Sequence, residues 1–219
     1  MEYDIDSVKE VLNICADKAI YSKPLLTELD SRMGDGDLGM SMSKGAMSIK
    51  NEIISYKGTD IGEFFRKCAA TLNRAAPSTM GTLLSGAMMM LGKKLKGRIF
   101  LEDKDILAIP VIMADSIMMR GNAKLGDKTI LDSLIPLAEA MNASYALTGD
   151  LKTAVREAAT AAKKGAKSTK GLIAKVGRAK WIADRSREYP DSGAVLCSIL
   201  IDALAYTEKH EGYKLPNYE

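Results

Sequence analysis

The stretch ILAIPVIMADSIMM, residues 106–119, decides between an all-α fold and one with a buried sheet. An apolar run of this kind can form a buried strand, but strands are usually shorter than this run. Ala108, Ile112, Asp115 and Met119 recur at steps of three or four, which is the spacing of one helix face. The stretch is therefore predicted to be helical.

The same periodicity recurs along most of the chain. Val8, Val11 and Leu12 begin one such pattern over residues 7–20, where we expect Ser7 to cap the helix and Glu10 to complete a capping box. Pro24 suits the first turn of a second helix. Further helices are expected over residues 41–55, 60–76, 80–96, 104–119, 129–146, 150–164 and 192–207.

Strand signals are weak, because β-branched and aromatic residues are sparse and hardly alternate with polar ones. With eight or nine helices expected, little of the chain is left for a sheet. A length of 219 residues suits one large domain, which we expect to span residues 1–219. The predicted fold class is all-α.

The composition and the N-terminal sequence indicate the cellular compartment in which the protein is expected. The chain is 47% hydrophobic and 27% charged, and no apolar run is long enough to cross a bilayer. The acidic N-terminus lacks the basic start and apolar stretch of a signal peptide. Cys15, Cys68 and Cys197 are odd in number and far apart, so buried reduced thiols are expected. These features predict a cytoplasmic protein with no membrane contact.

The single histidine, His210, lies in a polar tail. Histidine-activated nucleophiles and zinc sites that use histidine are therefore disfavoured.

An acidic cluster interrupts the helical pattern at LTELDSRMGDGDLGMSMSKGA, residues 26–46. Asp30, Asp35 and Asp37 fall within eight residues, and Arg32 is the one basic residue among them. Carboxylates held close together repel one another unless a cation compensates, and Mg²⁺ prefers oxygen ligands. The spacing does not fit an EF-hand. A glycosyltransferase-type Asp-x-Asp site remains open, as does an ordinary polar turn.

Small hydroxyl-bearing residues begin the helical pattern near residue 80. Pro77, Ser78, Thr79 and Gly81 stand where a helix N-terminus would offer free N–H groups to a phosphate. Taken alone, these residues favour an ordinary N-cap.

Residues 152–180 carry nine basic side chains and one acidic residue, Glu157. Three glycines punctuate this region, so we expect the helix to give way to a mobile loop over residues 165–191 that folds over an anion. A solvated face is the alternative. Trp181 is the one aromatic residue nearby, which disfavours nucleic acid as a partner.

In chain order, six short motifs resemble the nucleotide-binding L subunit of dihydroxyacetone kinase. They are LTELD (26–30), GDGD (34–37), ST (78–79), GDKT (126–129), GRA (177–179) and DSGA (191–194). Singly, Thr129 and Ser192 could be helix caps and Arg178 a solvated side chain. The resemblance implies a closed barrel of about eight antiparallel amphipathic helices with the nucleotide at one rim.

The resemblance also implies a site. Asp30, Asp35 and Asp37 would be the catalytic, metal-binding residues that hold two Mg²⁺ ions against the phosphates. The residues around ADP or ATP would be Leu38, Gly39, Met40, Ser41, Ser78, Thr79, Met80, Gly81, Gly121, Ile130, Arg178, Asp191, Ser192 and Gly193.

Three departures from the family pattern concern this site. Leu38 stands where the family usually has histidine, and residues 75–81 replace a glycine-rich segment. Ser192 stands where the family usually has proline. These changes bear on nucleotide affinity and on the identity of the sugar.

The implied activity is phosphoryl transfer to a small ketose held by a separate K subunit. The nucleotide would be ADP recharged in place by a phosphotransferase-system subunit, or exchangeable ATP. A kinase for another acceptor and a non-catalytic regulator are the alternatives. A homodimer is left open.

Overall fold

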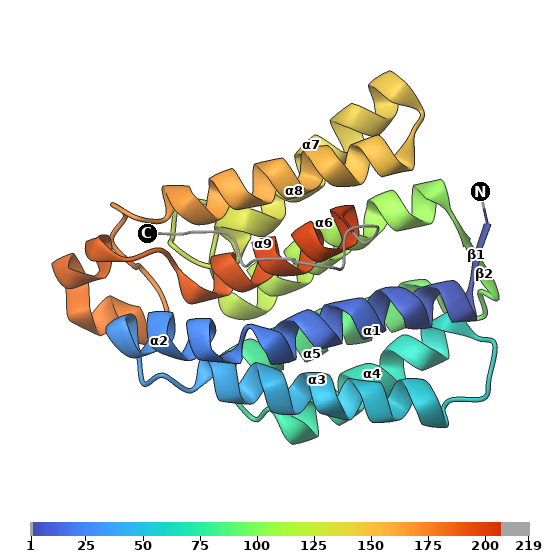
Figure 1. Ribbon diagram of the computed structural model, residues 1–219, viewed down its shortest axis with the longest axis horizontal. Coiled ribbons are helices and arrows are strands. Elements are labelled where there is room, and N and C mark those ends of the chain that lie inside the picture. The colour runs from blue at the N-terminus through green and yellow to red at the C-terminus, as the bar shows by residue number, and fades with distance from the viewer. Residues whose placement is uncertain (1, 207–219) are drawn as a thin grey trace.

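Nine α-helices account for most of residues 2–206, which the computed structural model describes apart from the side chain of Ala183 (Figure 1). In chain order they are α1 (Ile5–Tyr21), α2 (Lys23–Met33), α3 (Leu38–Ser55), α4 (Ile61–Ala75), α5 (Thr79–Lys94), α6 (Asp103–Gly121), α7 (Leu131–Thr148), α8 (Leu151–Ser168) and α9 (Ser192–Ala205). The all-α prediction is confirmed, and residues 106–119 lie within α6. His210 and the predicted end of the last helix at residue 207 lie outside the described residues.

Three smaller elements were not predicted. Strands β1 (Glu2–Asp4) and β2 (Phe100–Glu102) form an antiparallel pair in which Tyr3 lies opposite Leu101. A 3₁₀ helix, η1 (Arg178–Glu188), lies between α8 and α9. Three-residue strands are too short to produce a detectable alternation.

The helices pack on one another in a ring. The contacts join α1 to α3, α3 to α4, α4 to α5, α5 to α6, α6 to α7, α7 to α8, α8 to α9, and α9 back to α1. Helix α2 packs on α3, α9 and η1. Phe64, Leu26 and Ile61 lie in one apolar cluster inside the ring, and Leu131 lies in a second. Burial of these side chains is the main force that holds the helices together.

Helix α8 extends further than predicted. Ala154, Ala158 and Ala162 give it a narrow buried face, and Gly165 continues that face. A Cβ added at Gly165 would lie 2.1 Å from the backbone oxygen of Asp132 in α7. Gly165 therefore permits close helix packing, and the predicted end of the helix at Lys164 was wrong.

Asp4, and not Ser7, caps α1. The Asp4 carboxylate accepts a hydrogen bond from the backbone N–H of Ser7 at 2.9 Å. Ser78 caps α5, and Asp191 caps α9. The predictions of Ser7 and Ser192 as caps were wrong, because in both cases an aspartate earlier in the chain takes that position.

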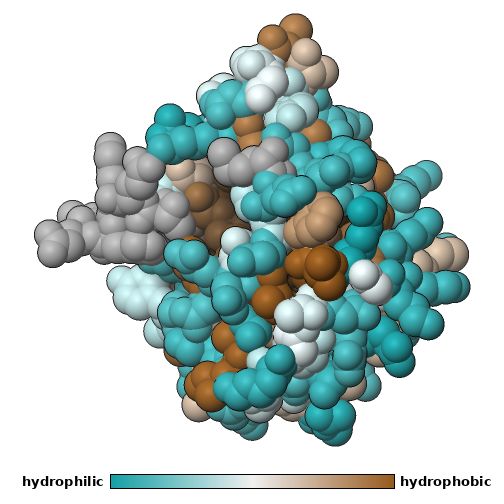
Figure 2. Space-filling model, turned by 90° about the vertical axis from the view of Figure 1, so that its right-hand side faces the viewer, coloured by the Kyte–Doolittle hydropathy of each residue, from teal (hydrophilic) through white to brown (hydrophobic). Residues whose placement is uncertain are grey.

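The loops that carry the predicted site residues meet at one end of the molecule, at the left in Figure 1. The β1–β2 pair lies at the other end. Figure 2 shows this other end, where hydrophilic side chains cover most of the face and small hydrophobic patches interrupt them.

The cysteines are free thiols. Cys68 and Cys197 are buried and Cys15 is half-buried. Burial raises the pKa of the Cys68 thiol to about 12 and that of Cys197 to about 11. Among the described residues, no helix is long and apolar enough to span a membrane.

Candidate functional site

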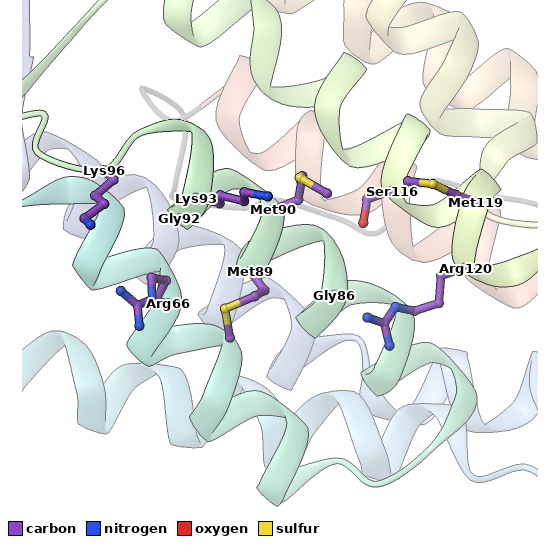
Figure 3. Close-up of a pocket in the computed structure, with 10 residues that line it drawn as sticks. All are labelled: Arg66, Gly86, Met89, Met90, Gly92, Lys93, Lys96, Ser116, Met119 and Arg120. Carbon is purple, nitrogen blue, oxygen red and sulfur yellow. The ribbon is translucent and has the colours of Figure 1, made fainter.

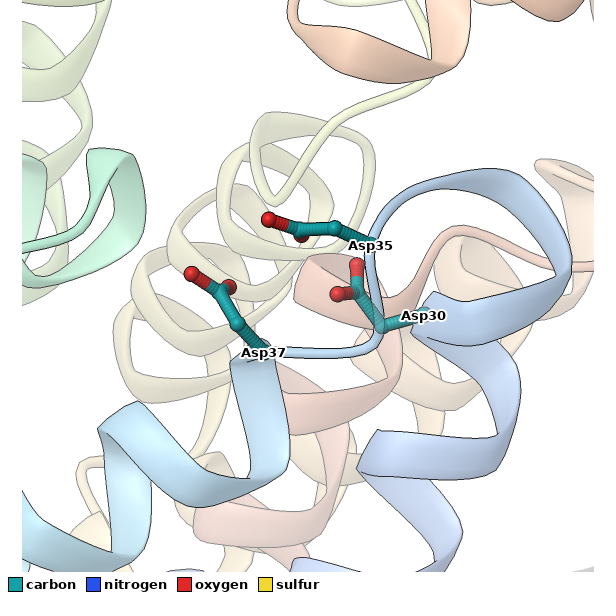
Figure 4. Close-up of side chains that lie close together, drawn as sticks. All are labelled: Asp30, Asp35 and Asp37. Atoms are coloured by element: carbon teal, nitrogen blue, oxygen red, sulfur yellow. The ribbon is translucent and has the colours of Figure 1, made fainter.

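Three aspartates converge where α2 ends and α3 begins. Asp30 lies in the last turn of α2, Asp35 in the connecting loop, and Asp37 at the N-cap position of α3. One carboxylate oxygen of each lies within 4.8 Å of the others. Figure 4 shows the three side chains close together. Gly36, with φ +74°, makes the tight turn that brings them together.

These carboxylates fit a hard divalent cation. Burial, followed by the nearby charge of Asp30, raises the pKa of Asp37. Such repulsion is relieved when a cation lies between the groups. Carboxylate oxygens are the ligands that Mg²⁺ prefers. The residues present therefore fit the magnesium site expected from the sequence.

Asp30 is held in place from two other elements. Its Oδ1 accepts a hydrogen bond from the Ser192 hydroxyl at 3.2 Å, and its Oδ2 accepts one from the Leu38 N–H at 3.3 Å. These bonds tie the cluster to the starts of α9 and α3.

Arg178 faces the same carboxylates. It forms an ion pair with Asp35, and its Nη1 lies 3.9 Å from Oδ2 of Asp37. Its side chain is 56% exposed, so the arginine reaches the cluster from the solvent side. Arg178 is therefore not merely solvated.

A pocket of about 200 Å³ adjoins the cluster. The predicted site residues that line it are Asp30, Asp35, Asp37, Leu38, Ser78, Thr79, Met80, Gly121, Ile130, Arg178, Asp191, Ser192 and Gly193. These come from six separate stretches of the chain. Sequence motifs far apart in the chain thus meet in one cavity.

Four predicted residues do not line the pocket. Gly39 and Gly81 are buried against backbone, where an added Cβ would lie 2.3 Å from the Lys23 oxygen and 1.9 Å from the Ala76 oxygen respectively. Met40 is exposed, and Ser41 is half-buried in α3. The two glycines permit the close packing that shapes the site.

Other residues line the pocket without having been predicted. They are Met33, Gly34, Leu83, Ile117, Ala123, Lys128, Thr129, Val176, Gly177 and Ala179. The apolar members give it a wall, but nothing in the helical pattern distinguishes them from core residues. Lys128 and Thr129 belong to the GDKT motif, which was the available signal.

The start of α5 lines the pocket with Ser78, Thr79 and Met80. The Ser78 hydroxyl accepts a hydrogen bond from the Gly81 N–H at 3.2 Å, so Ser78 is an N-cap. Thr79 and Met80 occupy the first turn, where N–H groups lack partners within the helix and favour an anion. Capping and phosphate binding are compatible here.

Residues 169–191, which we call the strap, connect α8 to α9 and carry Arg178. The expected mobile loop is a tied segment that contains η1: Gly171 N–H donates to the Arg187 oxygen, and Ala174 N–H to the buried Ser186 hydroxyl. At its end, Asp191 accepts a hydrogen bond from Ala194 N–H at 2.8 Å. Burial raises the pKa of Asp191 to about 7.

A second pocket, of about 620 Å³, lies on α4, α5 and α6 (Figure 3). Its charged lining residues are all basic: Arg66, Lys93, Lys96 and Arg120. Met89, Met90 and Met119 supply its apolar surface. Without carboxylates in its lining, this pocket does not offer the ligands of a magnesium site.

Comparisons with known proteins give consistent results. Residues 32–206 match the model of the DAK2 domain family. The chain is 27% identical over 198 residues to the ADP-binding subunit DhaL of the PEP-dependent dihydroxyacetone kinase of Escherichia coli, with 90% of this chain and 94% of that protein covered. It is 30% identical over 201 residues to an L-erythrulose kinase of Pectobacterium atrosepticum, of which it spans 34%.

The fold has solved counterparts. A crystal structure of the dihydroxyacetone kinase of C. freundii superposes with a TM-score of 0.72 at 21% identity, covering 91% of this chain and 34% of that one. A second structure of that kinase, in complex with AMP-PNP and Mg²⁺, gives a TM-score of 0.70 at 20% identity.

Proposed function

The chain belongs to the DAK2 domain family, and from this membership we propose that it is the nucleotide- and magnesium-binding subunit of a dihydroxyacetone-type kinase. The relative from Escherichia coli is named as an ADP-binding subunit, and this chain covers 94% of its length. One observation carries the proposal: three converging carboxylates, Arg178 and the start of α5 share one pocket.

The proposed site residues divide the work of binding a nucleoside phosphate. Asp30, Asp35 and Asp37 hold two Mg²⁺ ions, which neutralise phosphate charge when bound. The first turn of α5 offers backbone N–H groups to phosphate oxygens, and Arg178 offers a guanidinium. Positioning and charge neutralisation supply most of the catalysis in phosphoryl transfer.

The acceptor is proposed to be a small ketose bound by a separate K subunit. No histidine lies in the described residues. Apart from the aspartates assigned to metal, the carboxylate in the pocket lining is Asp191, which is buried and accepts the capping hydrogen bond of α9. We propose bound ADP that a phosphotransferase-system subunit recharges, because two relatives are named PEP-dependent kinases. Exchange of ATP is the alternative donor mode.

A different ketose is the second candidate acceptor. Two relatives are named as L-erythrulose and D-erythrulose kinases, with 30% and 31% identity to this chain.

We also propose that the segment before residue 32 belongs to the same domain as the matched region, since α1 packs on α3 and α9.

The first experiment is to denature the purified protein and identify the released nucleotide by chromatography. Near-stoichiometric ADP supports the site and the recharged mode. Released ATP, or an empty protein that binds Mg·ATP in a titration, supports exchange. A protein that is empty and binds neither ADP nor ATP with Mg²⁺ contradicts the proposal.

The acceptor is tested with a purified K subunit. Dihydroxyacetone, L-erythrulose and D-erythrulose are offered separately, and the phosphorylated sugar is measured. A protein loaded with ATP that transfers phosphate to none of the three would favour a regulatory role over catalysis.

A further inference from the structure

Lys128 is a buried lysine that joins the two ends of the strap. Its side chain is 2% exposed. Its ammonium donates one hydrogen bond to the backbone oxygen of Thr169 and one to that of Tyr189, both at 2.6 Å. These two carbonyls lie where the strap begins and where it ends. Lys128 therefore joins the two ends of a segment of more than twenty residues, beside the hydrogen bond that the Asp191 N–H donates to the Thr169 hydroxyl at 2.8 Å.

The turn that carries Lys128 is built to aim it inward. Lys128 has φ 62°, in the left-handed region that non-glycine residues seldom adopt. The Asp132 carboxylate holds this turn by accepting hydrogen bonds from the N–H groups of Gly126 and Thr129, both at 2.7 Å. A strained residue persists where its surroundings fix it, and such positions cluster at functional sites.

Nearby carboxyl groups offset part of the cost of burying Lys128. Asp132 and Asp191 face its ammonium, and their attraction opposes the effect of burial, which lowers the pKa of Lys128. A buried ammonium with hydrogen-bond partners and nearby carboxylates is tolerated. Its removal takes a donor from the Tyr189 carbonyl and leaves the Thr169 carbonyl with the Leu172 N–H.

The same turn also holds the middle of the strap. Lys175 donates to Asp127 Oδ1 at 3.1 Å and to the Gly126 oxygen at 3.0 Å, and its N–H donates to the Asp127 oxygen. The strap is thus fixed to residues 126–128 at its base and again shortly before Arg178. From there Arg178 reaches Asp35 and Asp37.

We propose that Lys128 is a positioning residue, whose hydrogen bonds to Thr169 and Tyr189 fix the strap so that Arg178 faces the acidic cluster and a bound phosphate. The part that concerns phosphate rests on the proposed function. The part that concerns the strap does not, so the two can fail separately.

Trp181 makes the strap directly observable. It is the single tryptophan of the chain, it lies in η1, and its side chain is 86% exposed. Time-resolved fluorescence anisotropy of Trp181 therefore reports motion of the strap. We expect Lys128→Met to add a fast depolarising component while far-UV circular dichroism stays as in the wild type.

Lys170→Met is the matched control, because it makes the same chemical change at an exposed position on the strap. It should leave the anisotropy decay unchanged. Lys128→Arg keeps a charged donor and should lie closer to the wild type than Lys128→Met. If Lys128→Met does not fold, Lys128→Gln decides, because its neutral side chain is one bond shorter and should not donate to both carbonyls. A fast depolarising component in Lys128→Gln supports the clamp, and a decay equal to that of the wild type overturns it.

A double-mutant cycle tests the link to Arg178. Titrations with Mg·ADP should show about tenfold weaker binding for Lys128→Met, and Arg178→Ala should add little in that background. Losses that add in full would overturn action through Arg178. A wild-type protein that binds no nucleotide contradicts the proposed function, while the Trp181 anisotropy still tests the clamp.

Discussion

The Ser192 hydroxyl donates a hydrogen bond to Oδ1 of Asp30 at 3.2 Å and so connects two residues 162 positions apart. Proline, which the family usually has at this position, has no hydroxyl group to donate this hydrogen bond. Ser192 is available for it because Asp191 takes over the capping of α9. Asp30 therefore has a structural partner in addition to its proposed role as a metal ligand.

Asp35 and Asp37 are the better positions to test for metal binding. Asp35 forms an ion pair with Arg178. Asp37 occupies the N-cap position of α3, but its side chain forms no capping hydrogen bond. We expect Asp35→Asn and Asp37→Asn to weaken Mg²⁺-dependent ADP binding by at least about tenfold, because each removes a charge that faces the cation. Isothermal titration with and without Mg²⁺ measures this, and circular dichroism should show unchanged helicity.

Asp115→Asn is the control for this pair. Asp115 is an exposed carboxylate on α6 outside the pocket, so its variant should bind as the wild type does. Wild-type ADP affinity in both cluster variants would refute the metal assignment.

Removal of Arg178 should change two affinities in opposite directions. Arg178→Ala removes a contact to phosphate, so we expect ADP to bind about tenfold more weakly in the presence of Mg²⁺. The same change removes the ion pair with Asp35, so Mg²⁺ alone should bind more tightly. Titrations with Mn²⁺ as a paramagnetic substitute measure the second effect. Lowered affinity for both ligands would mean that Arg178 supports the fold of the cluster instead.

The raised pKa of Asp191 predicts how the stability of the protein depends on pH. Its carboxyl has a pKa of about 7 in the folded protein, because burial disfavours the charged form, and an ordinary value near 3.8 when unfolded. Between these values the folded state binds more protons than the unfolded state, so this contribution to the free energy of unfolding falls as pH rises from about 4 to about 7.

Urea denaturation at several pH values in EDTA checks this sign. Asp191→Asn keeps a capping side chain but cannot ionise, so its stability should depend less on pH over that interval than the stability of the wild type does. Parallel curves for the two proteins would show that Asp191 titrates normally.

The helical content was predictable because it depends on local periodicity. The pattern of residues 106–119 was sufficient to assign α6, although the helix starts at Asp103 and includes Pro110. The acidic cluster was also predictable, because its three members lie within one short stretch of sequence. That these aspartates form one site with Ser78, Gly121 and Arg178 was expected from the family resemblance. The structure brings these residues to one pocket.

The remaining differences between the sequence-based expectations and the structure concern contacts between distant residues. Lys128 was not assigned, because its partners, Thr169 and Tyr189, are set by the path of the strap. Gly39 and Gly81 were expected to surround the nucleotide, but their small size is needed against neighbouring backbone. A sequence motif identifies such residues, but it does not tell whether a residue contacts the ligand or packs against the rest of the protein.

Gly165 allows the packing argument to be tested directly. Its replacement by alanine would place a methyl group 2.1 Å from the Asp132 backbone oxygen, which cannot move aside as a flexible side chain could. We expect Gly165→Ala to lower the free energy of unfolding by about 1–3 kcal/mol, the usual cost of overpacking, despite the higher helix propensity of alanine.

Gly121→Ala is the matched comparison. Its new methyl group would meet Leu83 Cδ2 at 3.4 Å, which is ordinary contact, so its stability should be close to that of the wild type. Urea denaturation of the two variants separates steric conflict from the general effect of adding a methyl group to a helix. If Gly165→Ala is as stable as Gly121→Ala, then α7 and α8 do not pack as closely as described, and the glycine would mark the end of α8, as the sequence pattern predicted.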